Sequence, residues 1–220
     1  MNVGADEIKA LAEHLLLDDN YLRHLAELEI EERRQRRIER NLHDSELPGE
    51  KTLATLTRAR LPAKVQRMLP TLCNGAFVER GENVLAFGQP GRGKTHLACV
   101  IGHELIQRGR RVYFTPTYAL VQRLLQAKRD LVLEKELTRL DRFDAVILDD
   151  IGYVQQSREE MEVLFTFLSD RYERRSVIIS SNLVIKKWDR IFRDPMTTAA
   201  AIDRFIAVIL EVTGTSYRTD

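Results

Sequence analysis

The sequence predicts an α/β domain: a parallel, five-stranded, doubly wound sheet with helices on both faces. After residue 81, short continuously apolar runs alternate with longer segments of helical periodicity, and such runs are typical of parallel strands that are covered on both sides. A glycine-rich loop follows the first apolar run and leads into a helix, as expected at the carboxyl edge of such a sheet. We expect strands at 84–87, 112–114, 145–148, 177–179 and 208–212, and helices at 96–107, 118–128, 131–140, 158–171 and 198–205.

The first 80 residues are organised differently from the predicted sheet domain. Residues 6–43 have helical periodicity, with residues 18–20 as an expected break between two helices. The polar Pro-Gly stretch 44–51 has the composition of a linker, and Pro62 and Pro70 are expected to interrupt the segments that follow. We therefore divide the chain into a helical region at 1–47, a linker and adaptor at 48–80, and the sheet domain at 81–220.

The composition is that of an ordinary globular protein, and it does not indicate a nucleic-acid binder by charge alone. The chain has 34 Lys and Arg against 33 Asp and Glu, a net charge of +1. No apolar run approaches the roughly 20 residues that span a bilayer, and the N-terminus has no signal-peptide pattern, so we expect a cytoplasmic protein without a membrane segment. Two cysteines, Cys73 and Cys99, are too few for a zinc site or a disulfide framework.

The strongest motif is the loop at 88–95, which matches the nucleotide-binding pattern G-x-x-x-x-G-K-[ST] in full. Its glycines allow backbone N–H groups to converge on phosphate oxygens, Lys94 is expected to reach the β- and γ-phosphates, and the Thr95 hydroxyl is expected to bind Mg²⁺. The alternative is a plain glycine turn, which the position between a strand and a helix disfavours. The predicted ligands are ATP and Mg²⁺, and the predicted binding residues are Gly88, Gln89, Pro90, Gly91, Arg92, Gly93, Lys94, Thr95 and His96.

Polar residues that follow two other strands complete the expected catalytic site. Asp149 and Asp150 directly follow the third strand, where Asp149 would hold Mg²⁺ and Asp150 would be the general base. Solvent-facing carboxylates are the alternative. Asp150 is one methylene shorter than the Glu that many such ATPases carry, which favours slow hydrolysis. Asn182 follows the fourth strand, expected between the first and third, where it would either position the attacking water or cap the next helix.

Arg204 is the candidate for a catalytic residue supplied to another subunit. It lies in the helix expected at 198–205, whose apolar face would leave its guanidinium exposed. An exposed arginine at a domain edge can act in a neighbour's ATP site, which would require a homo-oligomer. A surface ion pair with Asp203 is the alternative.

Arginines concentrate near the end of the N-terminal helical region, and two interpretations of them remain open. Glu29 with Arg33 and Glu32 with Arg36 have the i,i+4 spacing of a salt-bridged solvent helix. The same strip has enough positive charge to bind DNA phosphates. Lys128 and Arg129, between the second and third strands, are equally ambiguous. The DNA-binding candidates are therefore Arg33, Arg34, Arg36, Arg37, Arg40, Lys128 and Arg129.

Several motifs taken together resemble those of the IstB-type transposition helper ATPases, which are related to DnaC-type helicase loaders within the AAA+ initiator group. The motifs lie at residues 31–40, 88–98, 148–153, 180–183, 200–204 and 216–218. The resemblance implies a P-loop NTPase fold of the AAA+ type without a C-terminal helical lid. It also implies ATP-dependent assembly on duplex DNA with little sequence preference, and presentation of that DNA to the transposase of the same element.

The resemblance also assigns roles to individual residues. It implies Asp149 as the Mg²⁺ ligand, Asp150 as the catalytic carboxylate, Asn182 as a polar sensor and Arg204 as the trans-acting arginine, with helices at 118–142 facing DNA. A DnaC-like helicase loader and an ATP-gated DNA-binding scaffold with negligible hydrolysis are the rival interpretations. The scaffold is favoured by Asp150 and by a stretch from Arg204 to Val208 that is shorter than is usual in the family.

Overall fold

A computed structural model describes residues 5–152, 157–183 and 208–213, with side chains from residue 20 onward. The chain divides into two units, residues 1–40 and residues 41–220. Among the described residues, none of the helices combines the length and apolar character that crossing a membrane requires.

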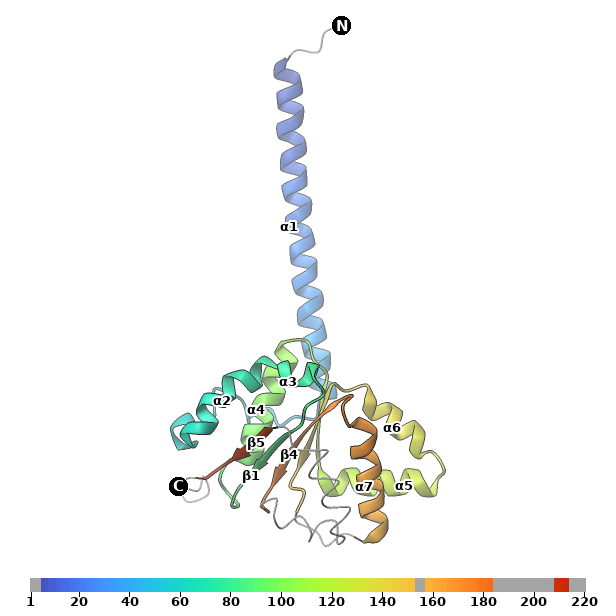
Figure 1. The fold of residues 1–220 in the computed structure, drawn as a ribbon. Coiled ribbons are helices and arrows are strands. Elements are labelled where there is room, and N and C mark those ends of the chain that lie inside the picture. Colours follow the sequence, from blue (N-terminus) through green and yellow to red (C-terminus); the bar gives the residue numbers. More distant parts are fainter. Residues whose placement is uncertain (1–4, 153–156, 184–207, 214–220) are drawn as a thin grey trace. The chain divides into compact units, whose positions relative to one another are not determined.

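The N-terminal region is one helix, α1 (Ala5–Asp44), and the break expected at residues 18–20 is absent (Figure 1). Asp and Asn disfavour helix by only about half a kcal/mol each, too little to end a helix by themselves. Ion pairs along the exposed surface of α1 offset part of this unfavourable free energy. Arg33 Nε lies 2.7 Å from Glu29 Oε1, Arg36 pairs with Glu32, and Arg34 pairs with Glu31. The i,i+4 pairs expected from the sequence are therefore confirmed.

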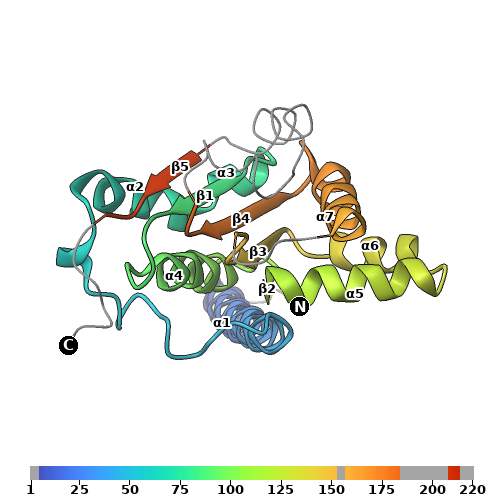
Figure 2. The same ribbon diagram turned by 90° about the horizontal axis from the view of Figure 1, so that it is seen from below.

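The second unit contains the five-stranded, all-parallel sheet that the sequence predicts (Figures 1 and 2). The strand order is β2-β3-β4-β1-β5, so β4 lies between β1 and β3 as expected. Phe87 pairs with Ser181 and Pro116 with Asp149, which brings the carboxyl ends of four strands to one edge. The strands are β1 (Val84–Phe87), β2 (Val112–Pro116), β3 (Ala145–Asp149), β4 (Ser176–Ser181) and β5 (Val208–Glu211).

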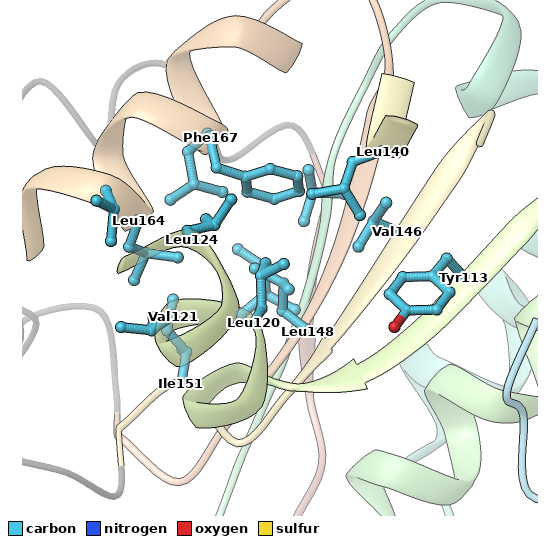
Figure 3. Packing of buried hydrophobic residues seen from close by; sticks show 14 of the residues in the cluster. Tyr113, Leu120, Val121, Leu124, Leu140, Val146, Leu148, Ile151, Leu164 and Phe167 are labelled. Carbon is cyan, nitrogen blue, oxygen red and sulfur yellow. The ribbon is translucent and has the colours of Figure 1, made fainter. Parts of the chain in front are cut away.

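One face of the sheet is covered by α5 (Thr117–Arg129), α6 (Leu133–Asp141) and α7 (Arg158–Arg171). Figure 3 shows the interlocking side chains, with Val146 and Leu148 of β3 against residues of α5 and α7 such as Leu124 and Phe167. Because strand side chains alternate, Ile147 points to the opposite face. There it meets α4 (Lys94–Gln107), and a Cβ on Gly102 would lie 2.8 Å from Ile147 Cδ1.

The segment before β1 contains the 3₁₀ helix η1 (Arg58–Arg60) and the helices α2 (Ala63–Asn74) and α3 (Ala76–Glu79). Pro62 precedes α2, as expected of a residue that interrupts a helix. Pro70, in contrast, lies inside α2, so the interruption expected there is wrong. Proline removes one helical hydrogen bond, and the buried apolar face of α2, which includes Val65, Leu69 and Leu72, offsets that loss.

The stretch expected to be a linker is fixed to the sheet domain. We call residues 45–57 the strap. Ser45 is fully buried, and its carbonyl oxygen accepts a hydrogen bond of 2.7 Å from Phe114 N of β2. A Cβ on Gly102 would lie 3.2 Å from Leu47 Cδ1, so the strap also packs against α4. Figure 2 shows this connection running beside α4 on its way to α2.

Both cysteine thiols are buried, and burial raises their pKa to about 11 for Cys73 and about 12 for Cys99. Since the thiolate is the reactive form, we expect neither thiol of the folded protein to react with Ellman's reagent within minutes at pH 8. Both should react at once in denaturant. Rapid reaction of one thiol in the native protein would contradict its burial.

Candidate functional site

The glycine-rich loop between β1 and α4 has a backbone shape that side chains would block. The carbonyl oxygen of Val212 would lie 2.2 Å from a Cβ on Gly88, while Val212 N donates to Phe87 O at 2.8 Å. Gly93, the residue before α4, has a φ of 85°, in the left-handed region that favours glycine. The loop therefore brings its backbone close to β5 and opens the N-terminus of α4, a geometry suited to an anion.

Lys94 places a buried cation at this loop. Its side chain is only 8% exposed, and its Nζ donates a hydrogen bond of 3.0 Å to the carbonyl oxygen of Gln89 in the same loop. A buried ammonium group needs polar partners, and here the loop itself supplies one. The cation and the α4 N-terminus together form a site for phosphate groups, as the motif predicts.

Asp149 connects the loop to the neighbouring strands. Its Oδ1 accepts a hydrogen bond of 2.8 Å from Thr95 Oγ1 and another from Ser180 Oγ. Ser180 Oγ in turn accepts from Asp150 N at 2.9 Å. A hydroxyl and a carboxylate in contact are the hard oxygen ligands that Mg²⁺ prefers, so these residues fit the cation that the sequence predicts.

Asp150 and Asn182 lie at the same cavity, which has a volume of about 380 Å³ and is also lined by residues of the loop. Asp150 has a φ of 60°, an uncommon conformation for a residue other than glycine. Asn182 Oδ1 is buried and has no hydrogen-bond partner among the described residues. An amide oxygen left without a partner beside the phosphate loop indicates a group that the ligand or its water completes.

Two lining residues of the cavity were not among the candidates from the sequence. Ser180 is buried in β4, and a polar residue at the end of an apolar strand is the signal that would have found it. Lys51 comes from the strap, more than 40 positions before the loop lysine, and no sequence pattern marks it. His96, a predicted binding residue, lines the cavity as well.

The DNA-binding candidates divide into paired and unpaired residues. Lys128 Nζ lies 2.9 Å from Glu162 Oε1, and three of the α1 arginines have the acidic partners given above. Arg37, Arg40 and Arg129 are exposed and have no ion pair within the described part of the chain. Arg204 and the junction that follows it lie outside the described residues, as does the helix expected at 198–205.

Comparison with known proteins identifies the family. The model of the IstB-like ATP-binding protein family matches residues 5–220. The chain belongs to this family. A family member from Sinorhizobium fredii, named as a proposed insertion sequence ATP-binding protein, is 44% identical over 201 residues, which cover 90% of this chain and 67% of the relative. The proposed ATP-binding protein of insertion sequence IS21 from Pseudomonas aeruginosa is 38% identical over 188 residues, 84% of this chain and 71% of that protein.

Solved structures share the fold of this IstB-family chain. A crystal structure of the DnaC helicase loader superposes with a TM-score of 0.58 at 22% identity, over 68% of this chain and 89% of the loader. The replication initiator DnaA, bound to AMPPCP and single-stranded DNA, gives a TM-score of 0.65 at 16% identity, over 78% of this chain and 52% of DnaA. At these identities the likeness establishes the fold alone, and the fold predicted from the sequence is confirmed.

Proposed function

We propose that this chain is the Mg²⁺-dependent ATPase of an insertion sequence, which binds duplex DNA and delivers it to the transposase of the same element. The observation that carries the ATPase part is the contact of Asp149 with Thr95 of the phosphate loop and Ser180 of the next strand. The names of the IstB-family relatives support the connection to ATP and to insertion sequences.

In the proposed reaction the protein residues bind the phosphates, orient the attacking water and remove its proton. The loop N–H groups and Lys94 hold the phosphates, and Asn182 orients the attacking water through its side-chain amide. Asp150 accepts the proton of that water as the general base. Bound Mg²⁺ would neutralise charge that develops on the phosphate oxygens, with Thr95 and Asp149 as its protein ligands.

The DNA contacts are proposed from the unpaired cations. Arg37, Arg40 and Arg129 are exposed and lack ion pairs within the described residues, so phosphate contact displaces no internal partner. Arg33, Arg34, Arg36 and Lys128 would have to exchange a carboxylate for a phosphate, which is feasible because exposed ion pairs contribute about 1 kcal/mol or less. Arg204 is proposed to complete the ATP site of a neighbouring subunit in a homo-oligomer.

A second candidate function is an ATP-gated DNA-binding scaffold that hydrolyses ATP negligibly. Asp150 favours it, because its carboxylate is one methylene shorter than that of Glu and lies on a residue with left-handed backbone geometry. A DnaC-like helicase loader would share the same core, so the site does not distinguish it from the transposition helper. A DNA-transfer assay with the cognate transposase would distinguish the two functions.

The proposal predicts that the purified protein hydrolyses ATP faster when duplex DNA is present. Lys94→Ala removes the buried ammonium at the loop and should reduce turnover on the order of hundredfold or more. Arg204→Ala should reduce turnover by a similar factor while leaving nucleotide binding to each subunit intact. Phosphate release, with and without a 50-base-pair duplex of arbitrary sequence, measures both effects.

Arg158→Ala is a suitable control because Arg158 is an exposed arginine at the start of α7 and does not line the cavity. It should hydrolyse ATP as the unmodified protein does. ATP-dependent DNA binding without turnover would establish the scaffold instead. Turnover that DNA and Arg204→Ala both leave unchanged would refute the oligomeric, DNA-dependent ATPase.

A further inference from the structure

Lys51 brings a second lysine to the cavity that Lys94 occupies, from a part of the chain remote from the phosphate loop. It is half-buried, and it lines the cavity together with Gly91, Lys94 and Thr95. No hydrogen bond or ion pair of its ammonium group is formed with the described residues. A half-buried cation without a partner among the described residues, at a cavity built for phosphates, is suited to bind an anionic ligand.

A hydrogen-bond network holds the backbone on both sides of Lys51. Thr55 Oγ1 donates to the carbonyl oxygen of Glu50 at 2.6 Å, and it accepts from Thr52 N at 3.1 Å. His96 Nε2 lies 3.1 Å from Thr52 O and 3.1 Å from Thr55 Oγ1. Since a carbonyl oxygen only accepts, His96 Nε2 carries the proton in this arrangement. The residues before and after Lys51 are therefore both fixed to α4.

A second histidine of α4 contacts the backbone near the start of the strap. His103 Nε2 lies 3.0 Å from Pro48 O, and it is seven positions after His96, so both side chains lie on the same side of the helix. The strap is thus held at Ser45, Pro48 and Thr52 by bonds to its backbone. Such a sequence of anchors leaves little freedom for the segment that carries Lys51.

We propose that Lys51 is a second phosphate-binding lysine of the nucleotide site, and that Thr55 and His96 are positioning residues that hold it there. The inference rests on the proposed binding of ATP. It goes beyond the phosphate loop because it makes the strap part of the nucleotide site. A bound nucleotide then contacts the strap as well as the sheet domain, and the strap directly follows α1.

Direct binding of ADP and of the non-hydrolysable analogue AMPPNP tests Lys51. Lys51→Met should weaken the affinity for both nucleotides about tenfold, because one charge-assisted hydrogen bond is lost. Lys51→Arg should retain most of the affinity. Lys64→Met is the matched control because Lys64 is exposed on α2 and does not line the cavity. Isothermal titration calorimetry gives the dissociation constants, and thermal unfolding verifies the fold of each variant.

A double-mutant cycle tests the positioning role of Thr55, which does not itself line the cavity. Thr55→Val keeps the shape but removes the hydroxyl, and it should weaken nucleotide binding about threefold. In a Lys51→Met background the same change should have no effect, because there is no ammonium group left to position. Thr166→Val is the control, since the one partner of Thr166 Oγ1 among the described residues is a carbonyl of its own helix, Glu162 O.

The outcomes separate the inference from the proposed function. If the unmodified protein binds neither nucleotide, the proposed ATP binding fails and the inference fails with it. If the protein binds nucleotide and Lys94→Ala abolishes binding, but Lys51→Met binds like the unmodified protein, the inference alone is overturned. An effect of Thr55→Val that persists undiminished without Lys51 would likewise exclude the positioning role.

Discussion

Asp149→Asn is expected to reduce ATP hydrolysis on the order of hundredfold or more while the fold stays intact. Asn has nearly the same shape as Asp, and its amide oxygen can still accept the hydrogen bonds that Asp149 Oδ1 receives from Thr95 and Ser180. The variant loses only the negative charge, which an Mg²⁺ site requires. Phosphate release at saturating ATP and a fixed, limiting Mg²⁺ concentration measures the effect.

The matched control is Asp130→Asn, because Asp130 is exposed at the end of α5 and, within the part of the chain that the structure describes, its carboxylate accepts only from Gln126 Nε2. It should leave turnover unchanged. Raising the Mg²⁺ concentration should partly restore Asp149→Asn if the lost charge acts through metal affinity. Wild-type turnover in Asp149→Asn at limiting Mg²⁺ would exclude Asp149 as a metal ligand.

The strands of the domain could be predicted because burial on both faces leaves a local signal. Val146, Ile147 and Leu148 are fully buried, and such an apolar run is visible in the sequence without any knowledge of its neighbours. The expected strands were too short where polar residues continue them. β4 extends to Ser180 and Ser181, whose buried hydroxyls are satisfied by Asp149 and by the backbone of Leu183.

The candidate site was predictable to the extent that its residues belong to local motifs. Asp149 is the last residue of β3, and the loop, Asp150 and Asn182 each follow a strand directly, so their convergence follows from the parallel sheet. Lys51 could not be found in this way. The strap is held largely through its own backbone carbonyl groups, as at Pro48 and Thr52, and every residue has a carbonyl group whatever its identity. Contacts of that kind leave no pattern in the sequence.

The same limitation applied to Arg171, a charged residue at the end of α7 that is only 1% exposed. Its guanidinium donates to Leu140 O at 3.0 Å, Phe143 O at 2.8 Å and Ser176 O at 3.2 Å, which connects α7 to α6, to β4 and to the turn before β3. Burial lowers its pKa to about 10, so it remains charged at neutral pH. Sequence composition would have placed this arginine on the surface.

We expect Arg171→Met to lower the free energy of unfolding by about 3 kcal/mol. Met fills a similar apolar volume, and removing a buried charge is favourable in itself, but three carbonyl groups lose the guanidinium as a donor. Leu140 O keeps the hydrogen bond of 3.1 Å from Phe143 N, so the loss is greater at Phe143 O and Ser176 O. The second effect should dominate, because an unsatisfied buried polar group costs about 1–3 kcal/mol. Arg174→Met is the control: Arg174 is 57% exposed and pairs with Asp141 and Asp170, so its loss should change stability by less than about 1 kcal/mol. Urea unfolding followed by circular dichroism compares the two variants, and equal stabilities would mean that relief of the buried charge outweighs the lost hydrogen bonds.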